Sequence, residues 1–235
     1  MSRLIHVEAR PAATQVDTGT VAVIVVDMQN DFGAVGGMFD RAGIDIKPIQ
    51  AIVDPIGRVL QAARVNGIPI VYLKMAFEPD LSDSSYPDGP TWLKHLPLDA
   101  GEPTTSPDGR PSRILIRDTW NTEIVDELQP QPDDIVIYKN RYSGFYNTTL
   151  EETLRQRGVE TVVVVGATTS VCVDSTVRDA VFRDLHCIVL EDCTAEPIAH
   201  QAPRSNHEAT LLTLELLFAS IATSDILIAA LGEAG

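Results

Sequence analysis

Short runs of apolar, mostly β-branched residues recur along the chain, and each has the length of a β-strand. They lie at residues 20–26, 68–73, 134–138, 161–165 and 187–190. Helical spacing of apolar residues falls between and after them, at about 44–65, 121–128, 148–158, from 172 onward, 205–219 and 224–231. Strands that are apolar on both faces must be covered on both faces, as happens when helices connect parallel strands. The sequence therefore predicts an α/β fold, a three-layer doubly wound sandwich with a mainly parallel sheet.

The length of 235 residues and the 44% hydrophobic content are sufficient for one core, so we expect a single domain over residues 1–235. One segment, at about 78–111, is dense in proline, serine, glycine and aspartate, and it predicts a long excursion over the surface. Loops of this length within a domain usually cover a site or contact a partner. The formal net charge of −15 makes nucleic acid and anionic membrane surfaces poor partners.

The compartment is indicated by the cysteines and by the lack of targeting signals. The three cysteines, Cys172, Cys187 and Cys193, include no closely spaced pair, which favours reduced thiols over disulfides or a zinc site. No basic and apolar leader opens the sequence, and no run of about 18 apolar residues would cross a membrane. We expect a cytoplasmic protein.

Three reactive side chains follow predicted strands: Asp27, Lys139 and Cys172. Because the carboxyl ends of parallel strands meet at one edge of a sheet, we expect these groups to converge there. Cys172 lies after Gly166 and a turn of small residues, where a helix begins. A helix N-terminus favours anions, so this position is expected to lower the pKa of the thiol.

A thiol, a carboxylate and an ammonium group in one place suit acyl transfer, with backbone N–H groups near Thr168 and Cys172 as an oxyanion hole. Each residue also has a structural interpretation. Asp27 can cap a turn, Lys139 can be a solvated charge, and Cys172 can be a small core residue. From the residues alone, the catalytic and structural interpretations stay balanced.

The segments Val25–Phe32 (VVDMQNDF) and Gly166–Val173 (GATTSVCV), with Lys139 between them, resemble the motifs of the isochorismatase-like cysteine hydrolases. The resemblance extends over nearly the whole chain. It implies that Asp27 accepts a proton, that Lys139 is its charged partner and that Cys172 is the nucleophile. It also implies a cis peptide bond between Ala167 and Thr168, which turns backbone N–H groups toward an oxyanion beside Cys172.

Longer segments at 126–132, 139–148 and 172–179 are similar to ureidoacrylate amidohydrolases of pyrimidine degradation, and biuret and triuret hydrolases are close relatives. Nicotinamidases of the superfamily carry metal-binding histidines after the first motif, but no histidine lies between His6 and His95 here. Isochorismatases themselves lack the cysteine. The resemblance thus implies hydrolysis of a C–N bond in a small ureido or carbamoyl compound without metal or cofactor, by a homo-oligomeric enzyme. Ureidoacrylate or its peracid is the first candidate substrate, and biuret or triuret is the alternative.

Further side chains are candidates for substrate binding, and each has a structural alternative. They are Asn30, Phe32, Arg141, Tyr142 and Glu215. Arg141 can instead hold a surface turn, Phe32 can belong to the core, and Glu215 can lie on the outer face of its helix. Two other functions remain open: a catalytically silent binding module, which the intact triad argues against, and hydrolysis of a larger amide in an open pocket beneath the excursion.

Overall fold

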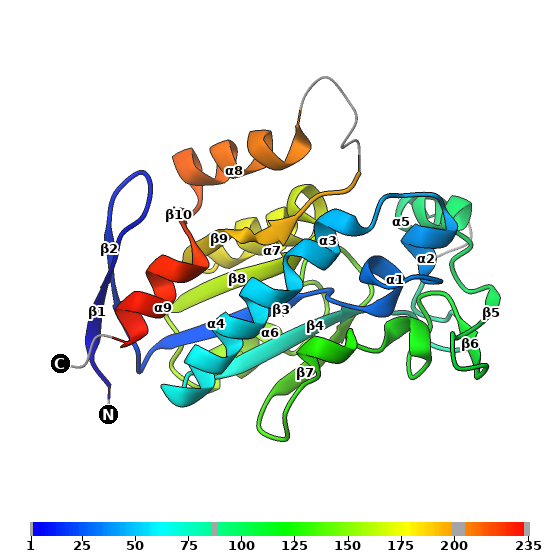
Figure 1. Cartoon of the computed structure of the whole chain (residues 1–235), viewed down its shortest axis with the longest axis horizontal. Helices are drawn as coiled ribbons and strands as arrows, with labels where there is room; N and C mark the ends of the chain where they lie inside the picture. Colours follow the sequence, from blue (N-terminus) through cyan, green and yellow to red (C-terminus); the bar gives the residue numbers. More distant parts are fainter. Residues whose placement is uncertain (1, 86–88, 199–204, 233–235) are drawn as a thin grey trace.

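The computed structural model describes residues 2–85, 89–198 and 205–232, and a parallel sheet lies at its centre (Figure 1). The six strands found there run in the order β10-β9-β8-β3-β4-β7, and every neighbouring pair is parallel. Their bounds are β3 (Val21–Val26), β4 (Ile70–Met75), β7 (Ile135–Lys139), β8 (Thr161–Ala167), β9 (His186–Ala195) and β10 (Ser220–Ala222). The chain builds outward from β3 through β4 to β7, then returns to β8 and builds the other way, so the topological switch lies between β3 and β8.

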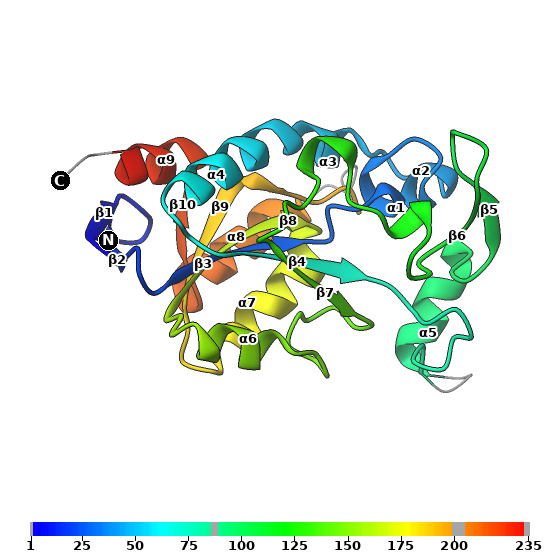
Figure 2. The same cartoon turned by 90° about the horizontal axis from the view of Figure 1, so that it is seen from below.

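Helices cover both faces of this sheet (Figure 2). One face packs against α3 (Lys47–Ala51), α4 (Val53–Val65) and α9 (Ser224–Gly232). The other packs against α6 (Leu150–Gln156), α7 (Asp174–Val181) and α8 (Asn206–Leu217). The predicted three-layer, doubly wound α/β sandwich is therefore confirmed.

Strand β3 shows why a continuous apolar run predicts a strand that is covered on both faces of the sheet. Val21, Val23 and Val25 point into the core on one side of the sheet, and the residues between them point into the core on the other. All six side chains are buried. Burial of each such side chain contributes roughly 1.5–3 kcal/mol, so the strand cannot lie at a surface without a large loss.

Two predicted helices differ from the structure. The helix expected over 44–65 is broken at Ile52 into α3 and α4. The helix expected over 121–128 is wrong: the segment forms two 3₁₀ turns, η2 (Trp120–Thr122) and η3 (Asp126–Leu128). Between those turns the backbone is extended, because Val125 N–H donates to the Met28 carbonyl and the Glu123 carbonyl accepts from Asn30 N–H. These tertiary bonds replace the helical ones.

The excursion contains more structure than its composition predicted. Its described residues include α5 (Pro90–His95), the turn η1 (Leu96–Leu98) and strand β5 (Pro103–Thr105), which pairs with β6 (Pro111–Arg113). Residues 86–88 of the predicted segment lie outside the described residues. Figures 1 and 2 show α5 at the same end of the sheet as the short helices α1 (Asn30–Gly33) and α2 (Met38–Arg41).

An antiparallel hairpin that the polar N-terminal sequence did not predict lies at the other end of the molecule (Figure 1). It consists of β1 (Leu4–Val7) and β2 (Thr14–Asp17), and it contacts α9. Only alternate residues of β1 are buried, so its apolar signal is half that of a central strand. Among the described helices, none combines the length and the hydrophobicity needed to cross a bilayer.

Gly166, near the end of β8, allows a direct test of how closely β8 packs against β3. Its φ is +114°, and a Cβ at this position would lie 2.1 Å from the Val26 carbonyl oxygen. We expect Gly166→Ala to lower the free energy of unfolding by about 3 kcal/mol, measured by urea denaturation. Gly158→Ala is the control, because its φ is also positive but nothing lies within 4 Å of the added Cβ. Equal losses for the two variants would contradict the close approach of β8 and β3.

Candidate active site

Asp27, Lys139 and Cys172 meet at the carboxyl ends of the strands, beside the topological switch. Asp27 directly follows β3, Lys139 is the last residue of β7, and Cys172 lies shortly after β8. Lys139 Nζ donates to Asp27 Oδ2 at 2.7 Å and to the Arg141 carbonyl at 3.2 Å. Both charged side chains are buried, with exposed fractions of 0% and 1%. The sheet therefore holds an ion pair away from water next to a thiol.

The backbone at Asp27 turns sharply, with a φ of +51°. Its N–H donates to the Leu73 carbonyl at 3.0 Å, and its carbonyl accepts from Gln29 N–H at 2.8 Å. Aspartate tolerates this left-handed region better than most residues. The turn leaves Asp27 Oδ1 buried, with no hydrogen-bond partner among the described residues. One carboxylate oxygen thus anchors Lys139, and the other is free to receive a proton.

Cys172 lies in a π-helical turn, η4 (Thr169–Val173), which leads into α7. The Thr168 carbonyl accepts from the N–H groups of Val171 and Val173 at 3.1 and 3.2 Å. Thr176 Oγ1 donates to the Cys172 carbonyl at 2.7 Å, which holds the end of the turn. The peptide bond between Ala167 and Thr168, at the start of this turn, is cis.

The expected effect of the helix start on the thiol is wrong in direction. Burial raises the pKa of the Cys172 thiol, and the Asp27 carboxylate raises it further, while Lys139 lowers it. Burial likewise raises the pKa of Asp27, against the influence of Lys139. Burial alone would lower the pKa of Lys139, but the interaction with Asp27 raises this pKa overall. A neutral thiol therefore lies next to the buried Asp27–Lys139 pair.

A small cavity of about 160 Å³ opens onto this site, and most of its walls are apolar. Asp27 and Cys172 lie at its base together with Ala167 and Thr168. The remaining lining residues are Phe32, Met38, Phe39, Met75, Lys94, His95, Leu98, Tyr142, Val171 and Ile198. Since α5 and η1 supply three of them, the excursion closes the cavity of its own chain.

The five predicted substrate-binding residues divide into two groups. Phe32 and Tyr142 line the cavity. Asn30 lies outside the cavity lining, and its Nδ2 donates to the Trp120 carbonyl at 2.8 Å. The Arg141 side chain donates to the carbonyls of Asp83 and Asn140 and is not among the lining residues either. Glu215 pairs with Arg10 at 3.0 Å and does not line the cavity.

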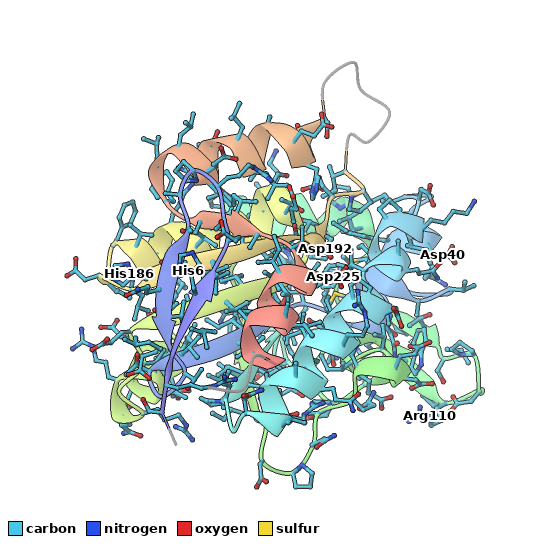
Figure 3. All side chains as sticks on the ribbon, turned by 60° about the vertical axis from the view of Figure 1, so that its left-hand side comes forward. His6, Asp40, Arg110, His186, Asp192 and Asp225 are labelled. Atoms are coloured by element: carbon cyan, nitrogen blue, oxygen red, sulfur yellow. The ribbon has the colours of Figure 1, made fainter. Side chains whose placement is uncertain are left out.

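Several cavity residues were not predicted from the sequence, above all Lys94 and His95 on α5. The available signal was His95, a histidine with an aromatic neighbour, Trp92, inside a segment otherwise poor in apolar residues. By contrast, neither His6 nor His186, both labelled in Figure 3, lines the cavity. In residues 2–85, 89–198 and 205–232, no cluster of histidine, cysteine and acidic side chains is suited to hold a metal ion.

Buried polar groups fix the elements around the site. Gln29 bonds to both backbone groups of Met75, at 2.6 and 3.0 Å. Asp31 accepts from the N–H groups of Met38 and Leu115 at 3.0 and 2.7 Å, and burial raises its pKa to about 7. These bonds join α1 to α2 and to the loop after β6, so they set the position of the Phe32 and Met38 walls.

A second group of bonds fixes the turn that carries the thiol. The buried Glu196 carboxylate accepts from Ser170 N–H at 2.8 Å and from Ile198 N–H at 2.9 Å. His207 Nδ1 and Thr169 Oγ1 are hydrogen-bonded at 2.9 Å, which ties this turn to α8. The free thiols of Cys187 and Cys193 are buried elsewhere and do not line the cavity.

Comparison with known proteins gives consistent matches. The isochorismatase domain model matches residues 21–226. Ureidoacrylate amidohydrolase RutB of Methylobacterium radiotolerans is 41% identical over 211 residues, covering 89% of this chain and 79% of that protein. The protein of the same name from Caulobacter segnis is 39% identical over 217 residues, covering 92% and 87%.

Solved structures share the same backbone. A cysteine hydrolase from Pseudomonas syringae pv. phaseolicola has a TM-score of 0.76 at 29% identity, and the alignment covers 97% of each chain. N-carbamoylsarcosine amidase from Thermoplasma acidophilum has a TM-score of 0.64 at 27% identity, covering 88% of this chain and 97% of that one. The similarity therefore includes the strands that carry Asp27, Lys139 and Cys172.

Lys139→Met tests the buried ion pair. Removing the ammonium leaves Asp27 buried without its partner, so we expect the free energy of unfolding at pH 7 to fall by roughly 3–5 kcal/mol. Burial raises the pKa of Asp27, so in this variant the folded protein takes up a proton that the unfolded chain releases. The loss should therefore shrink as the pH falls toward about 4, the ordinary value for aspartate.

Urea denaturation at several pH values measures this effect. The double variant Asp27→Asn/Lys139→Met removes both charges and should be more stable at pH 7 than Lys139→Met alone. A Lys139→Met protein as stable as the wild type at pH 7 would contradict the buried pair.

Proposed function

The chain belongs to the isochorismatase family, and from that premise we propose that it hydrolyses a C–N bond of a small ureide, with ureidoacrylate or its peracid as the substrate. As a member of this family with close amidohydrolase relatives, it is a hydrolase. The observation that carries the proposal is that Asp27, which is buried in an ion pair with Lys139 and keeps a free Oδ1, lines the same small cavity as Cys172. Relatives named ureidoacrylate amidohydrolase support the substrate.

In the first half of the proposed reaction, Asp27 takes the proton of the Cys172 thiol. The sulfur attacks the ureido carbonyl carbon, and the carbonyl oxygen becomes an oxyanion that the backbone N–H groups of Thr168 and Cys172 stabilise. The C–N bond then breaks, and Asp27 returns the proton to the departing amine. The product of this half is a carbamoyl group bound to Cys172 as a thioester.

In the second half, water attacks this carbamoyl carbon, and Asp27 accepts the proton of the water. The C–S bond breaks, carbamate leaves, and the sulfur regains its proton from Asp27. Lys139 keeps its proton throughout, because its role is to hold Asp27 in place and to offset negative charge. The raised pKa of Asp27 suits a group that must gain and lose a proton in each half.

The size of the cavity supports a small substrate. Its volume of about 160 Å³ is below the roughly 300–1,000 Å³ typical of sites for drug-sized ligands. Coverage by α5 and η1 disfavours the larger amide that an open pocket would have admitted. Biuret and triuret fit the same triad and remain the alternative substrates. The complete triad also disfavours a silent binding module.

Cys172→Ser is expected to lower kcat on ureidoacrylate by about a thousandfold or more, because a hydroxyl is a far weaker nucleophile at neutral pH. Cys193→Ser is the matched control, since that thiol is also buried and lies outside the cavity. Amine and carbamate release should be measured on ureidoacrylate, biuret, triuret and nicotinamide. Full turnover by Cys172→Ser, or activity on nicotinamide alone, would overturn the proposal.

We also propose that the enzyme acts in the cytoplasm as a homo-oligomer, with α8 packed against a second copy. The three free thiols are consistent with a reducing compartment. On α8, Leu212, Leu216 and Leu217 have exposed fractions of 56%, 65% and 69%. A helix that is apolar around most of its surface is normally covered.

Leu216→Glu on this face should therefore shift the sedimentation coefficient toward that of the monomer. Leu93→Glu, at another exposed leucine on α5, should leave the coefficient unchanged. A wild-type protein that sediments as a monomer would contradict the assembly.

A further inference from the structure

Besides Tyr142, two polar side chains of the cavity have no part in the proposed chemistry. Lys94 and His95 are adjacent at the end of α5, and both line the cavity that contains Asp27 and Cys172. The triad and the backbone N–H groups account for the carbonyl carbon, its oxygen and the proton that moves. These groups provide no binding partner for the N–H groups and any further substituent of a ureide.

His95 lines the cavity and has one ring nitrogen that is free to accept a hydrogen bond. It is 6% exposed, and its Nδ1 donates to the Thr91 carbonyl at 2.7 Å. A neutral imidazole with its proton on Nδ1 has its lone pair on Nε2. Nε2 has no hydrogen-bond partner within the described residues. Burial lowers the pKa of His95, and the positive charges of Lys139 and Arg141 also lower it, so the ring stays neutral.

The ring of His95 is held in place by its neighbours. Its centroid lies 5.7 Å from that of Phe77, edge to face, and 5.8 Å from that of Tyr142. Trp92, on the same helix as His95, packs against Phe77 with a distance of 5.5 Å between the ring centroids. Because the tautomer and the orientation are both fixed, the lone pair of Nε2 is ready to accept from an N–H group of a ligand.

Lys94 supplies a positive charge at the same place. It is exposed, and it forms no ion pair with any residue that the structure describes. Other nearby cations are engaged: Lys139 with Asp27, and Arg117 with Glu78 and Asp83. With a net charge of −15, the chain as a whole repels an anionic substrate. A cation on the cavity wall is therefore significant for any substrate that carries a carboxylate.

We propose that the end of α5 is a recognition site for a carboxylate-bearing ureide, in which His95 accepts the ureido N–H and Lys94 binds the carboxylate. This inference rests on the proposed function and names the feature that selects its substrate. Ureidoacrylate has an N–H next to the scissile bond and a carboxylate beyond it. Biuret and triuret have N–H groups but no carboxylate, so Lys94 distinguishes them from ureidoacrylate while His95 serves all three.

The experiment compares kcat and KM of the wild type and two variants on ureidoacrylate and on biuret. Lys94→Gln should raise KM for ureidoacrylate by about tenfold, the effect of losing a hydrogen-bonded charge, and change KM for biuret far less. Lys94→Arg should keep KM near the wild-type value. Lys47→Gln, an exposed lysine at the start of α3 outside the cavity, makes the same change in net charge and should have no effect.

Ionic strength gives a second measurement. The ratio of KM for ureidoacrylate in the wild type to KM in Lys94→Gln should rise with added salt. Salt screens the attraction at the exposed cation in the wild type only, whereas it screens the repulsion by the net charge of −15 in both proteins. Biuret is uncharged, so its KM should not respond to salt in either protein.

His95 is tested with a conservative pair. His95→Leu removes the acceptor and should lower kcat/KM by about tenfold on every ureide, whereas His95→Gln retains an acceptor oxygen and should recover part of the loss. Urea denaturation of both variants separates this effect from unfolding. Equal kinetics for Leu and Gln at this position would overturn the role of His95.

The outcomes separate this inference from the proposed function. A wild type that hydrolyses no ureide overturns the proposed function. A wild type that hydrolyses ureidoacrylate with a KM unchanged by Lys94→Gln overturns the carboxylate site and leaves the proposed function standing. A wild type that prefers biuret to ureidoacrylate also overturns the carboxylate site.

Discussion

The ion pair between Lys139 and Asp27 is the interaction on which the rest of the site depends. Two charges with almost no exposed surface are costly to bury, and a hydrophobic pair of the same volume is often no less stable. Parallel packing of β3, β4 and β7 nevertheless brings the two side chains to 2.7 Å. The pair fixes where Asp27 lies, and it leaves Oδ1 buried without a hydrogen-bond partner among the described residues, on a side chain that lines the same cavity as Cys172.

The burial that makes this pair costly also determines how the thiol is activated. A helix N-terminus alone would favour a standing thiolate, but desolvation outweighs it and raises the pKa of Cys172. Burial also raises the pKa of Asp27, so the proton can pass between two groups whose charged forms are both disfavoured by desolvation. Such matching keeps the thiol neutral in a buried site whose cavity has mostly apolar walls.

The sequence predicted most of what the central sheet determines. Runs such as Val162–Val165 are apolar on both faces, which permits only a covered strand, and strand ends then placed Asp27, Lys139 and Cys172 together. Long-range bonds were not predictable. The 121–128 segment is held extended by Met28 and Asn30, and Glu215 pairs with Arg10, nearly the whole chain away. Neither partner could be read from local spacing, because the fold alone brings them near.

The difference between sheet and loop also explains why Lys94 and His95 were not predicted from the sequence, and why we assign substrate selectivity to them. The triad lies at the ends of strands buried on both sides, where a substitution disturbs the ion pair and the core together. Lys94 and His95 lie on a short helix of the excursion, attached to the sheet through Phe77 and Tyr142. Under the proposed recognition role, changes at these two helix residues alter which ureide is bound and leave the Asp27–Lys139 pair in place. Chemistry on the sheet and recognition on the loop can therefore vary independently, as is common for sites on α/β scaffolds.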